Sequence, residues 1–226
     1  MDIIIQSLLN IVHLDESFVD IILLSLYISI IATIFSAIIS IILSSYIATT
    51  NFTGKKIIII FLNSLMSLPP VVVGLILYLI FSTSGFLGFM DLLYTPTIMI
   101  LAQFIIITPI IISLSIKSFT DRYNILKEYL YSLHTSKEKI RNTIIHESRF
   151  DLLIIILTGM SRALSEVGAV IIVGGNIDNI TRVMTTSIVL ETSRGELSLA
   201  LSLGLSLIII AVIINILTYT IKNKFL

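Results

Sequence analysis

Two ionisable residues, Arg162 and Glu166, lie deep inside a long apolar segment of the sequence. They stand about 11 and 15 residues into the stretch Leu152–Val173, a depth of ~16–22 Å at about 1.5 Å per residue of helix. If this segment crosses a bilayer, a lone charge at its centre costs at least ~2.5–3.5 kcal/mol, so the four-residue spacing predicts that the two side chains pair on one helix face. With the hydroxyl groups of Ser161 and Ser165 beside it, this face could guide an anion. The alternative is an ion pair that only holds the helix against a neighbour.

A second segment of interest, Leu65 to Gly74, contains two adjacent prolines, Pro69 and Pro70, in the middle of another apolar stretch. Neither proline can donate a backbone hydrogen bond, and both rings clash with the preceding turn, so we expect the helix to be kinked or locally unwound. Irregular backbone inside a membrane is tolerated where it is buried in protein or lines a cavity. Gly74 would let another helix or a substrate approach the backbone closely. The candidate translocation path therefore comprises Ser67, Pro69, Pro70, Gly74, Ser161, Arg162, Ser165 and Glu166. The alternative for the prolines is a kink that serves only helix packing.

The sequence lacks the residues that several other common functions require. Cysteine is absent, which excludes disulfides, thiol catalysis and cysteine metal sites, and the three histidines are scattered at positions 13, 134 and 146. No sequence of the form G-x-x-x-x-G-K-[ST] occurs, so the chain cannot bind ATP through a P-loop. The formal net charge is zero, which provides no basic field for nucleic acid. We expect no catalytic residue, no metal, no cofactor and no enzymatic activity; any ATP hydrolysis belongs to a partner.

The composition indicates which elements must hold these residues. The chain has 226 residues, of which 56% are hydrophobic and 12% charged, with a mean hydropathy of +1.08; a soluble domain has about 25% charged residues. Its apolar residues form five stretches long enough to cross ~30 Å of hydrocarbon as helices, namely Ile21–Tyr46, Ile57–Phe81, Ile98–Ile116, Leu152–Val173 and Leu197–Ile221. The predicted fold is an all-α polytopic membrane protein with about five transmembrane helices in one domain.

Basic residues collect in alternate connections between these stretches. Eleven of the fourteen lie in the segments 55–56, 117–149 and 222–224, and the positive-inside rule makes that side cytoplasmic. The predicted organisation is an extracytoplasmic N-terminal segment (1–20), a membrane domain (21–221) with a cytoplasmic loop (117–151), and a cytoplasmic tail (222–226). The connections Ser82–Thr97 and Gly174–Glu196 are then outside. The second of these is either a landing surface for a substrate-delivering protein or a cap on the bundle.

The cytoplasmic loop, about 35 residues long, is too long for a simple connector unless it has structure of its own. We expect two short helices, the first after Thr120 and Asp121 as N-caps and the second after a T-x-x-E capping box at Thr135 and Glu138. The break then falls near His134. The residues leave two roles open for this hairpin: an amphipathic element on the lipid surface, or a dock that offers an apolar stripe and a few charges to a cytosolic partner.

The position of the hairpin, between two late spans, is similar to that of the Glu-Ala-Ala loop in permeases of binding-protein-dependent ABC importers. Glu128 stands at the glutamate of that pattern and Ile144 at its distal isoleucine. The two alanines, the glycine and the proline of the pattern are replaced by Tyr129, Leu130, His134 and Glu147. The glycine is expected at a turn with positive φ, which histidine adopts at some cost. The resemblance implies that the residues coupling the chain to an ATPase are Glu128, Tyr129, Leu130, Leu133, His134 and Ile144.

Four further segments make the resemblance more specific: LMSLPPVVVG at 65–74, SRALSEVGA at 161–169, VGGN at 173–176 and TRVMTT at 181–186. Together they resemble the permease subunit of tungstate-type ABC importers, relatives of the molybdate and sulfate permeases, over about residues 21–221. This resemblance implies the type-1 transmembrane domain of ABC transporters in a bacterial or archaeal plasma (inner) membrane. It implies import of an oxyanion, most simply tungstate, with molybdate or sulfate as alternatives. The implied partners are a second copy of the chain, ABC ATPase subunits and an extracytoplasmic oxyanion-binding protein.

Two other classes of membrane protein are less consistent with the sequence. An ion-coupled secondary transporter should show an internal inverted repeat and carboxylates in several spans, but no repeat is visible and only Glu166 qualifies. A scaffold that transports nothing would need neither the Arg162–Glu166 pair nor the double proline.

Overall fold

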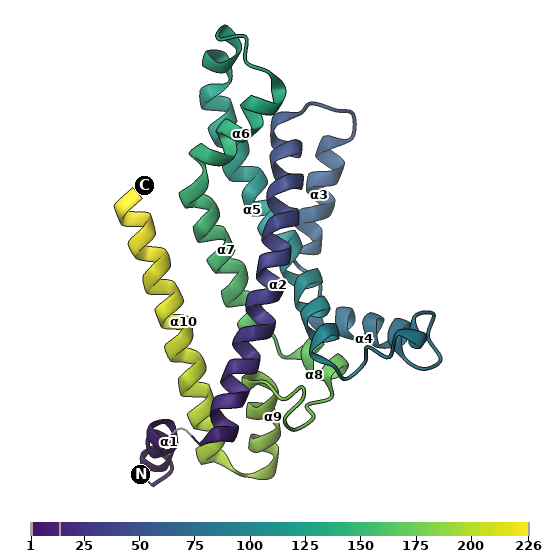
Figure 1. The fold of residues 1–226 in the computed structure, drawn as a ribbon, viewed down its shortest axis with the longest axis vertical. Coiled ribbons are helices and arrows are strands. Elements are labelled where there is room, and N and C mark those ends of the chain that lie inside the picture. Colours follow the sequence, from purple (N-terminus) through teal and green to yellow (C-terminus); the bar gives the residue numbers. More distant parts are fainter. Residues whose placement is uncertain (1, 14, 226) are drawn as a thin grey trace.

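The computed structural model describes residues 2–13 and 15–225, which form helices and connecting turns with no β-strand among them (Figure 1). The elements are α1 (Asp2–His13), α2 (Glu16–Thr49), α3 (Lys55–Leu65), α4 (Pro70–Phe81), a 3-10 turn (Gly88–Met90), α5 (Pro96–Ser132), α6 (Lys137–Glu147), α7 (Arg149–Leu164), α8 (Gly168–Gly174), α9 (Met184–Arg194) and α10 (Leu197–Phe225). Within this described part, α2, α5 and α10 are long and apolar enough to cross a membrane, and the bent pairs α3–α4 and α7–α8 raise the number to five if each is one span. The prediction of an all-α polytopic membrane protein is confirmed.

The second predicted span consists of two helices. α3 ends at Leu65, α4 begins at Pro70, and their axes differ by 94°. Pro69 between them has an extended ψ of 121°, because a residue that precedes a proline is pushed out of the helical region. Pro70 then takes the first helical position, where its missing N–H is not needed. The predicted disruption of the span Ile57–Phe81 at the prolines is confirmed.

The fourth predicted span is also broken, although the sequence has no proline there. α7 ends at Leu164, α8 begins at Gly168, and the two axes differ by 57°. The break satisfies its own polar groups: the Glu166 N–H donates to a carbonyl of the last α7 turn, and its side chain accepts from an N–H in the first α8 turn. The prediction of one continuous helix over Leu152–Val173 is wrong.

The segment predicted as a cytoplasmic loop (117–151) begins inside helix α5. α5 runs unbroken over Pro96–Ser132, so the first predicted loop helix is a continuation of the third span. Thr120 and Asp121 lie in the interior of α5, and their assignment as N-caps is wrong. The physical reason is that no glycine or proline interrupts residues 110–132, so the helix has nothing to end it where the membrane ends.

The turn between α5 and α6 falls where the sequence predicts it. His134 has a φ of +51°, the left-handed conformation in which a glycine is expected. The N-cap of α6 is Ser136, whose Oγ accepts a long hydrogen bond of 3.5 Å from the Lys139 N–H. The predicted capping box at Thr135 and Glu138 is therefore wrong by one residue.

α2 and α5 form the most extensive helix pair of the bundle. Their seam is closed by small side chains of α2, and Thr108 Oγ1 donates to Ser36 Oγ across it at 3.0 Å. Small residues let membrane helices approach closely, and interhelical hydrogen bonds add to the packing. The buried hydroxyl groups of α2 therefore serve helix packing.

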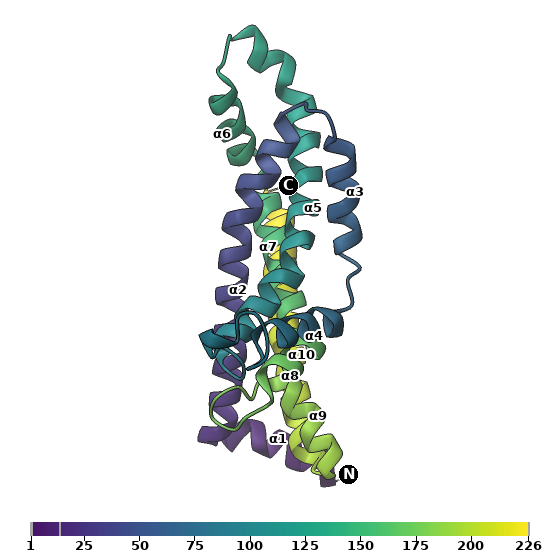
Figure 2. The same ribbon diagram turned by 90° about the vertical axis from the view of Figure 1, so that its right-hand side faces the viewer.

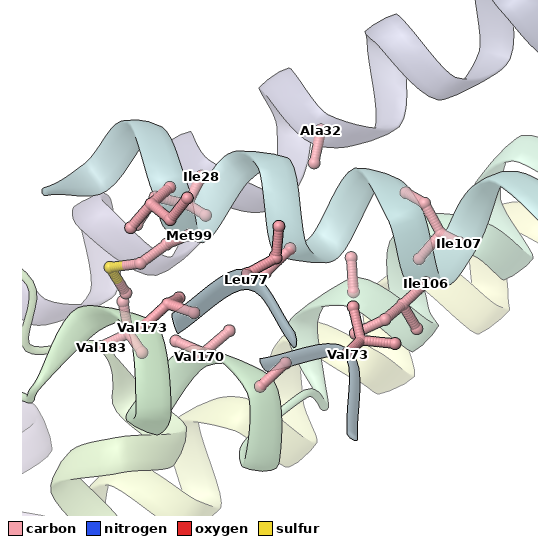
Figure 3. Packing of buried hydrophobic residues seen from close by; sticks show 14 of the residues in the cluster. Ile28, Ala32, Val73, Leu77, Met99, Ile106, Ile107, Val170, Val173 and Val183 are labelled. Atoms are coloured by element: carbon pink, nitrogen blue, oxygen red, sulfur yellow. The ribbon is translucent and has the colours of Figure 1, made fainter. Parts of the chain in front are cut away.

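The main hydrophobic core holds α4 and α8 against α2 and α5 (Figure 3). Among its members, which come from segments far apart in the chain, are Ile28, Ala32, Val73, Leu77, Met99, Ile106, Ile107, Val170, Val173 and Val183. The two short helices that follow the breaks are thus fixed by tertiary packing rather than by their own length.

The two ends of the bundle carry different elements. The α2–α3 connection and the α5–α6 turn lie at one end, whereas α1 and α9 lie at the other end in both views (Figures 1 and 2). α1 packs against α10, where Ser202 Oγ donates to the Ser7 carbonyl at 3.1 Å. Most of its exposed side chains are apolar, as in a helix that lies in a membrane interface: Ile3, Ile4, Ile5, Leu8 and Leu9, with Gln6 as an exposed polar residue among them.

Candidate functional site

The two broken helices cross close to their breaks. Gly74 of α4 lies so near α8 that a Cβ added to it would come within 2.8 Å of the Ala169 Cα. At the same crossing, a Cβ added to Gly168 would come within 2.6 Å of a Val71 methyl carbon. Because these distances are shorter than real Cβ contacts, the crossing needs glycine at both positions. The close approach at Gly74 is made by a helix backbone.

Arg162 and Glu166 form an ion pair with an Nη1–Oε2 distance of 2.9 Å. The Glu166 side chain is 3% exposed, and its Oε1 accepts from the Ala169 N–H at 3.3 Å. The Arg162 side chain is 38% exposed, so the cation is the accessible partner. The two residues do not share a helix face as predicted, because Arg162 lies in the last turn of α7 and Glu166 lies beyond the end of that helix, in the break. The carboxylate thereby joins the last turn of α7 to the first turn of α8.

Two residues that the sequence analysis did not select also hold this break. Gln103 of α5 donates its Nε2 to the Ala163 carbonyl at 3.0 Å, and Thr185 of α9 donates its hydroxyl to the Glu166 carbonyl at 2.9 Å. Both side chains are buried. Gln103 is the one polar residue in the apolar run 98–107, a signal that could have identified it. Thr185 lies in a polar segment and carries no comparable signal.

The other predicted path residues differ in exposure. Ser67 and Pro69 in the α3–α4 link are exposed, as is Ser165 in the α7–α8 break, whereas Pro70 and Ser161 are half-buried. The structure thus brings Gly74 and the ion pair to one crossing, with the hydroxyl groups at its edges.

The electrostatics of the crossing combine two positive features with one negative group. The first turn of α4 lies beside Gly168 and Glu166, and a helix N-terminus carries about half a positive elementary charge. The half-exposed guanidinium of Arg162 adds to this positive charge, and the buried carboxylate of Glu166 offsets part of it. This arrangement can attract an anion weakly without holding it.

The predicted coupling residues divide between two faces of the α5–α6 hairpin. Leu130 and Ile144 are 6% and 0% exposed and pack with Phe119 and Ile140 in a separate core cluster. The other four are exposed: Glu128, Tyr129, Leu133 and His134. Leu130 and Ile144 therefore hold the hairpin together, and only the exposed four can meet a partner.

An apolar row runs along the outer face of the hairpin. Three apolar residues recur every four positions along the end of α5 and the residue that follows it, and we call them the docking stripe. They are Ile125, Tyr129 and Leu133, which are 71%, 64% and 58% exposed. Glu128 stands beside them. The hairpin projects past the ends of α3 and α10 (Figure 1). A row of apolar side chains at helical spacing with a flanking charge fits a groove in another protein.

Polar contacts stiffen the hairpin and its base. The hydroxyl groups of Tyr123 and Tyr131 are 2.9 Å apart, and this hydrogen bond, with burial, raises the pKa of Tyr123 to about 12. The Tyr123 hydroxyl therefore stays protonated at neutral pH. At the base, Ser118 donates its hydroxyl to Asp151 Oδ2 at 3.0 Å, and Arg122 lies 3.9 Å from the same oxygen. These contacts tie α5 to the start of α7.

α5 joins the two parts of the candidate site without a break. Gln103, at the α7–α8 break, and Glu128, beside the docking stripe, are 25 residues apart in one helix, a distance of ~38 Å at about 1.5 Å per residue. One helix, with Pro109 between the two parts, therefore connects the hairpin to the contact that holds the break.

Known proteins are similar to this chain over most of its length. The chain is 40% identical over 213 residues to the tungstate uptake system permease protein TupB of Peptoclostridium acidaminophilum, covering 94% of this chain and 93% of that protein. It is 38% identical over 176 residues to TupB of Campylobacter jejuni, covering 76% and 72%. It is 33% identical over 205 residues to a probable anion ABC transporter permease protein of Haloferax volcanii, covering 88% of each chain. No family profile matches the chain.

Proposed function

Since the chain belongs to the family of permease subunits of tungstate and related anion ABC transporters, we propose that it provides the membrane path of an ATP-driven tungstate importer. Molybdate or another oxyanion is the alternative cargo. The chain works as a homodimer with two ABC ATPase subunits and an extracytoplasmic oxyanion-binding protein, and it has no ATPase site of its own. The observation that carries this proposal is the 40% identity over 94% of the chain to a tungstate uptake permease.

The proposed orientation places the α5–α6 hairpin in the cytoplasm. The N-terminus and α9 are then outside, and the C-terminus is cytoplasmic. Two observations support this orientation: basic residues concentrate in the connections at 55–56 and 117–149, and both connections lie at the end of the bundle opposite α1 and α9 (Figure 2).

In the proposed path, the dianion passes the crossing of α4 and α8. The N-terminus of α4 and the Arg162 guanidinium lower the electrostatic cost of a dianion inside the membrane. Glu166 reduces that attraction, because its carboxylate stays within 2.9 Å of the guanidinium. A site that releases its cargo must bind it weakly, and the paired guanidinium meets this requirement better than a free one.

In the proposed coupling mechanism, α5 acts as a lever. The docking stripe and Glu128 sit in a groove of the ATPase, and closure of the ATPase dimer on ATP displaces the hairpin. Because α5 is continuous from the hairpin to Gln103, the displacement reaches the Ala163 carbonyl and the break between α7 and α8. The path then opens to one side of the membrane or the other.

The test of this mechanism is Glu128→Ala in the reconstituted complex of permease, ATPase and binding protein. Glu128 is exposed, so the free energy of unfolding should change by less than ~0.5 kcal/mol, as for most surface substitutions. Tungstate uptake and the ATPase activity stimulated by the loaded binding protein should both fall several-fold, because a charge at the edge of an interface sets orientation and association rate.

Glu147→Ala is the matched control, since Glu147 is an exposed glutamate at the end of α6 outside the docking stripe. It should transport like the unmodified permease. Full coupled activity in Glu128→Ala, at equal amounts of permease in the membrane, would refute the role of this hairpin in transmission.

A further inference from the structure

A cavity of about 350 Å³ opens at the end of the bundle that carries α1 and α9. It lies between the start of α2, the segment that leads into α9, α9 itself and the start of α10. Among the described residues that line it are four carboxylates, Asp15, Asp178, Glu191 and Glu196, against one guanidinium, that of Arg182. The cavity is therefore acidic, although the proposed cargo is an anion.

Two of the four carboxylates are already paired. Asp178 lies 2.9 Å from the Arg182 guanidinium, and Glu191 lies 3.2 Å from Arg194 Nη1. Asp15 and Glu196 are exposed, and within the described residues neither forms an ion pair. Asp15 precedes α2, but its side chain makes no capping hydrogen bond to that helix. The cavity thus holds two carboxylates whose negative charge no neighbouring cation balances.

A buried hydroxyl in the cavity wall provides a second, independent observation. Ser187 of α9 is 1% exposed, lines the cavity, and its Oγ has no hydrogen-bond partner. A buried polar group without a partner costs about 1–3 kcal/mol. Within the described residues, the wall therefore offers a hydroxyl that can accept or donate a hydrogen bond, on the same helix as the buried carboxylate of Glu191. The buried Nε of Arg182, in the same lining, also has no partner there.

The spacing of the carboxylates excludes one kind of ligand and favours another. Within the described part of the chain, no three acidic or histidine side chains are close enough together to hold a metal ion. An oxyanion would be repelled. A lysine or arginine side chain, in contrast, carries three to five N–H donors that can reach acceptors spread over several ångströms.

We propose that this cavity is a socket for a basic side chain of the oxyanion-binding protein, inserted when that protein docks on the outer face. The inference rests on the proposed function, which supplies both the partner and the orientation. Asp15 and Glu196 attract the basic side chain, Ser187 accepts a hydrogen bond from it, and the Arg182–Asp178 pair forms the opposite wall. An acidic socket also positions the partner without competing for the oxyanion that the partner carries.

The test is the affinity of the tungstate-loaded binding protein for the permease–ATPase complex in nanodiscs. The double variant Asp15→Asn plus Glu196→Gln keeps the shape of two exposed side chains and removes their charge. It should weaken docking by roughly tenfold or more, mainly through slower association, and it should flatten the salt dependence. Asp91→Asn, a neutralised exposed carboxylate outside the cavity, is the matched control and should dock like the unmodified permease.

The possible results separate the socket from the function on which it rests. An unmodified complex that neither docks the binding protein nor imports tungstate overturns both proposals. A double variant that docks as tightly as the unmodified complex, while that complex transports, overturns the socket alone. Saturable binding of Ca²⁺ to the permease without a partner, lost in Glu196→Gln, would also overturn it, because the cavity would then be a metal site.

Discussion

The ion pair in the α7–α8 break predicts that its two alanine variants are unequal. The Glu166 side chain is only 3% exposed. In Arg162→Ala its carboxylate loses the guanidinium and keeps the hydrogen bond from the Ala169 N–H. Removal of one partner from a buried pair costs about 3–5 kcal/mol. Because the arginine is more than a third exposed, we expect the lower end of that range, about 3 kcal/mol.

The opposite variant, Glu166→Ala, should cost less. It leaves Arg162 unpaired, but that side chain is 38% exposed and can turn toward water. The lost hydrogen bond to the Ala169 N–H adds about 0.5–1.5 kcal/mol, so we expect a total of about 1–2 kcal/mol. The double variant leaves neither charge without its partner. It should lose about as much free energy of unfolding as Glu166→Ala alone. The magnitude of the coupling energy between the two residues is then about 3 kcal/mol, the cost of Arg162→Ala alone.

Thermal unfolding of the purified permease measures this cycle. For a chain of this size, 1 kcal/mol corresponds to about 2–4 °C in Tm, so Arg162→Ala should lower Tm by about 6–12 °C and Glu166→Ala by about 2–8 °C. Glu166→Gln, which keeps an acceptor for the Ala169 N–H, should be the mildest variant at this residue. Equal losses in the two alanine variants, or a double variant whose loss equals their sum, would refute the buried-pair reasoning.

Three more outcomes can be measured on the same protein. Gly74→Ala should lower the free energy of unfolding by about 1–3 kcal/mol, because the added Cβ meets the α8 backbone. Gly204 is a helical glycine with open space around it, so Gly204→Ala should raise the free energy of unfolding by about 0.5–1 kcal/mol. Equal Tm shifts in the two variants would contradict the close crossing of α4 and α8. His134→Gly should raise stability by about 0.5–1 kcal/mol, since glycine adopts the observed φ of +51° without strain; a lower Tm would count against it. In intact cells an impermeant thiol reagent should label Ser193→Cys and spare Ser136→Cys; the reverse pattern would invert the proposed orientation.

The sequence by itself determined the features that depend on local composition. Long apolar stretches predict membrane helices whatever their neighbours are, because the backbone must be satisfied within each segment. The two prolines at 69 and 70 predict a break for the same local reason, and the turn at His134 follows from the position of the expected glycine. The pairing of Arg162 with Glu166 follows from the cost of a lone charge in the membrane.

Only the tertiary structure decided how those features are used. No proline in the sequence predicts the break between α7 and α8. It exists because the carboxylate of Glu166 in the break, the Gln103 amide of α5 and the Thr185 hydroxyl of α9 satisfy its polar groups. In the same way, the four-residue spacing of Arg162 and Glu166 suggested one helix face, and the structure instead places the pair across a break.

The two faces of the α5–α6 hairpin and the acidic cavity depend on the fold as well. Leu130 is buried and Tyr129 exposed because Ile144, from the other arm of the hairpin, covers only one side of α5. The cavity joins Asp15 to Glu196, about 180 positions later in the chain. Sequence propensities act over a turn or two of helix, whereas burial and the pairing of distant polar groups are set when separate helices pack, so no local pattern contains them.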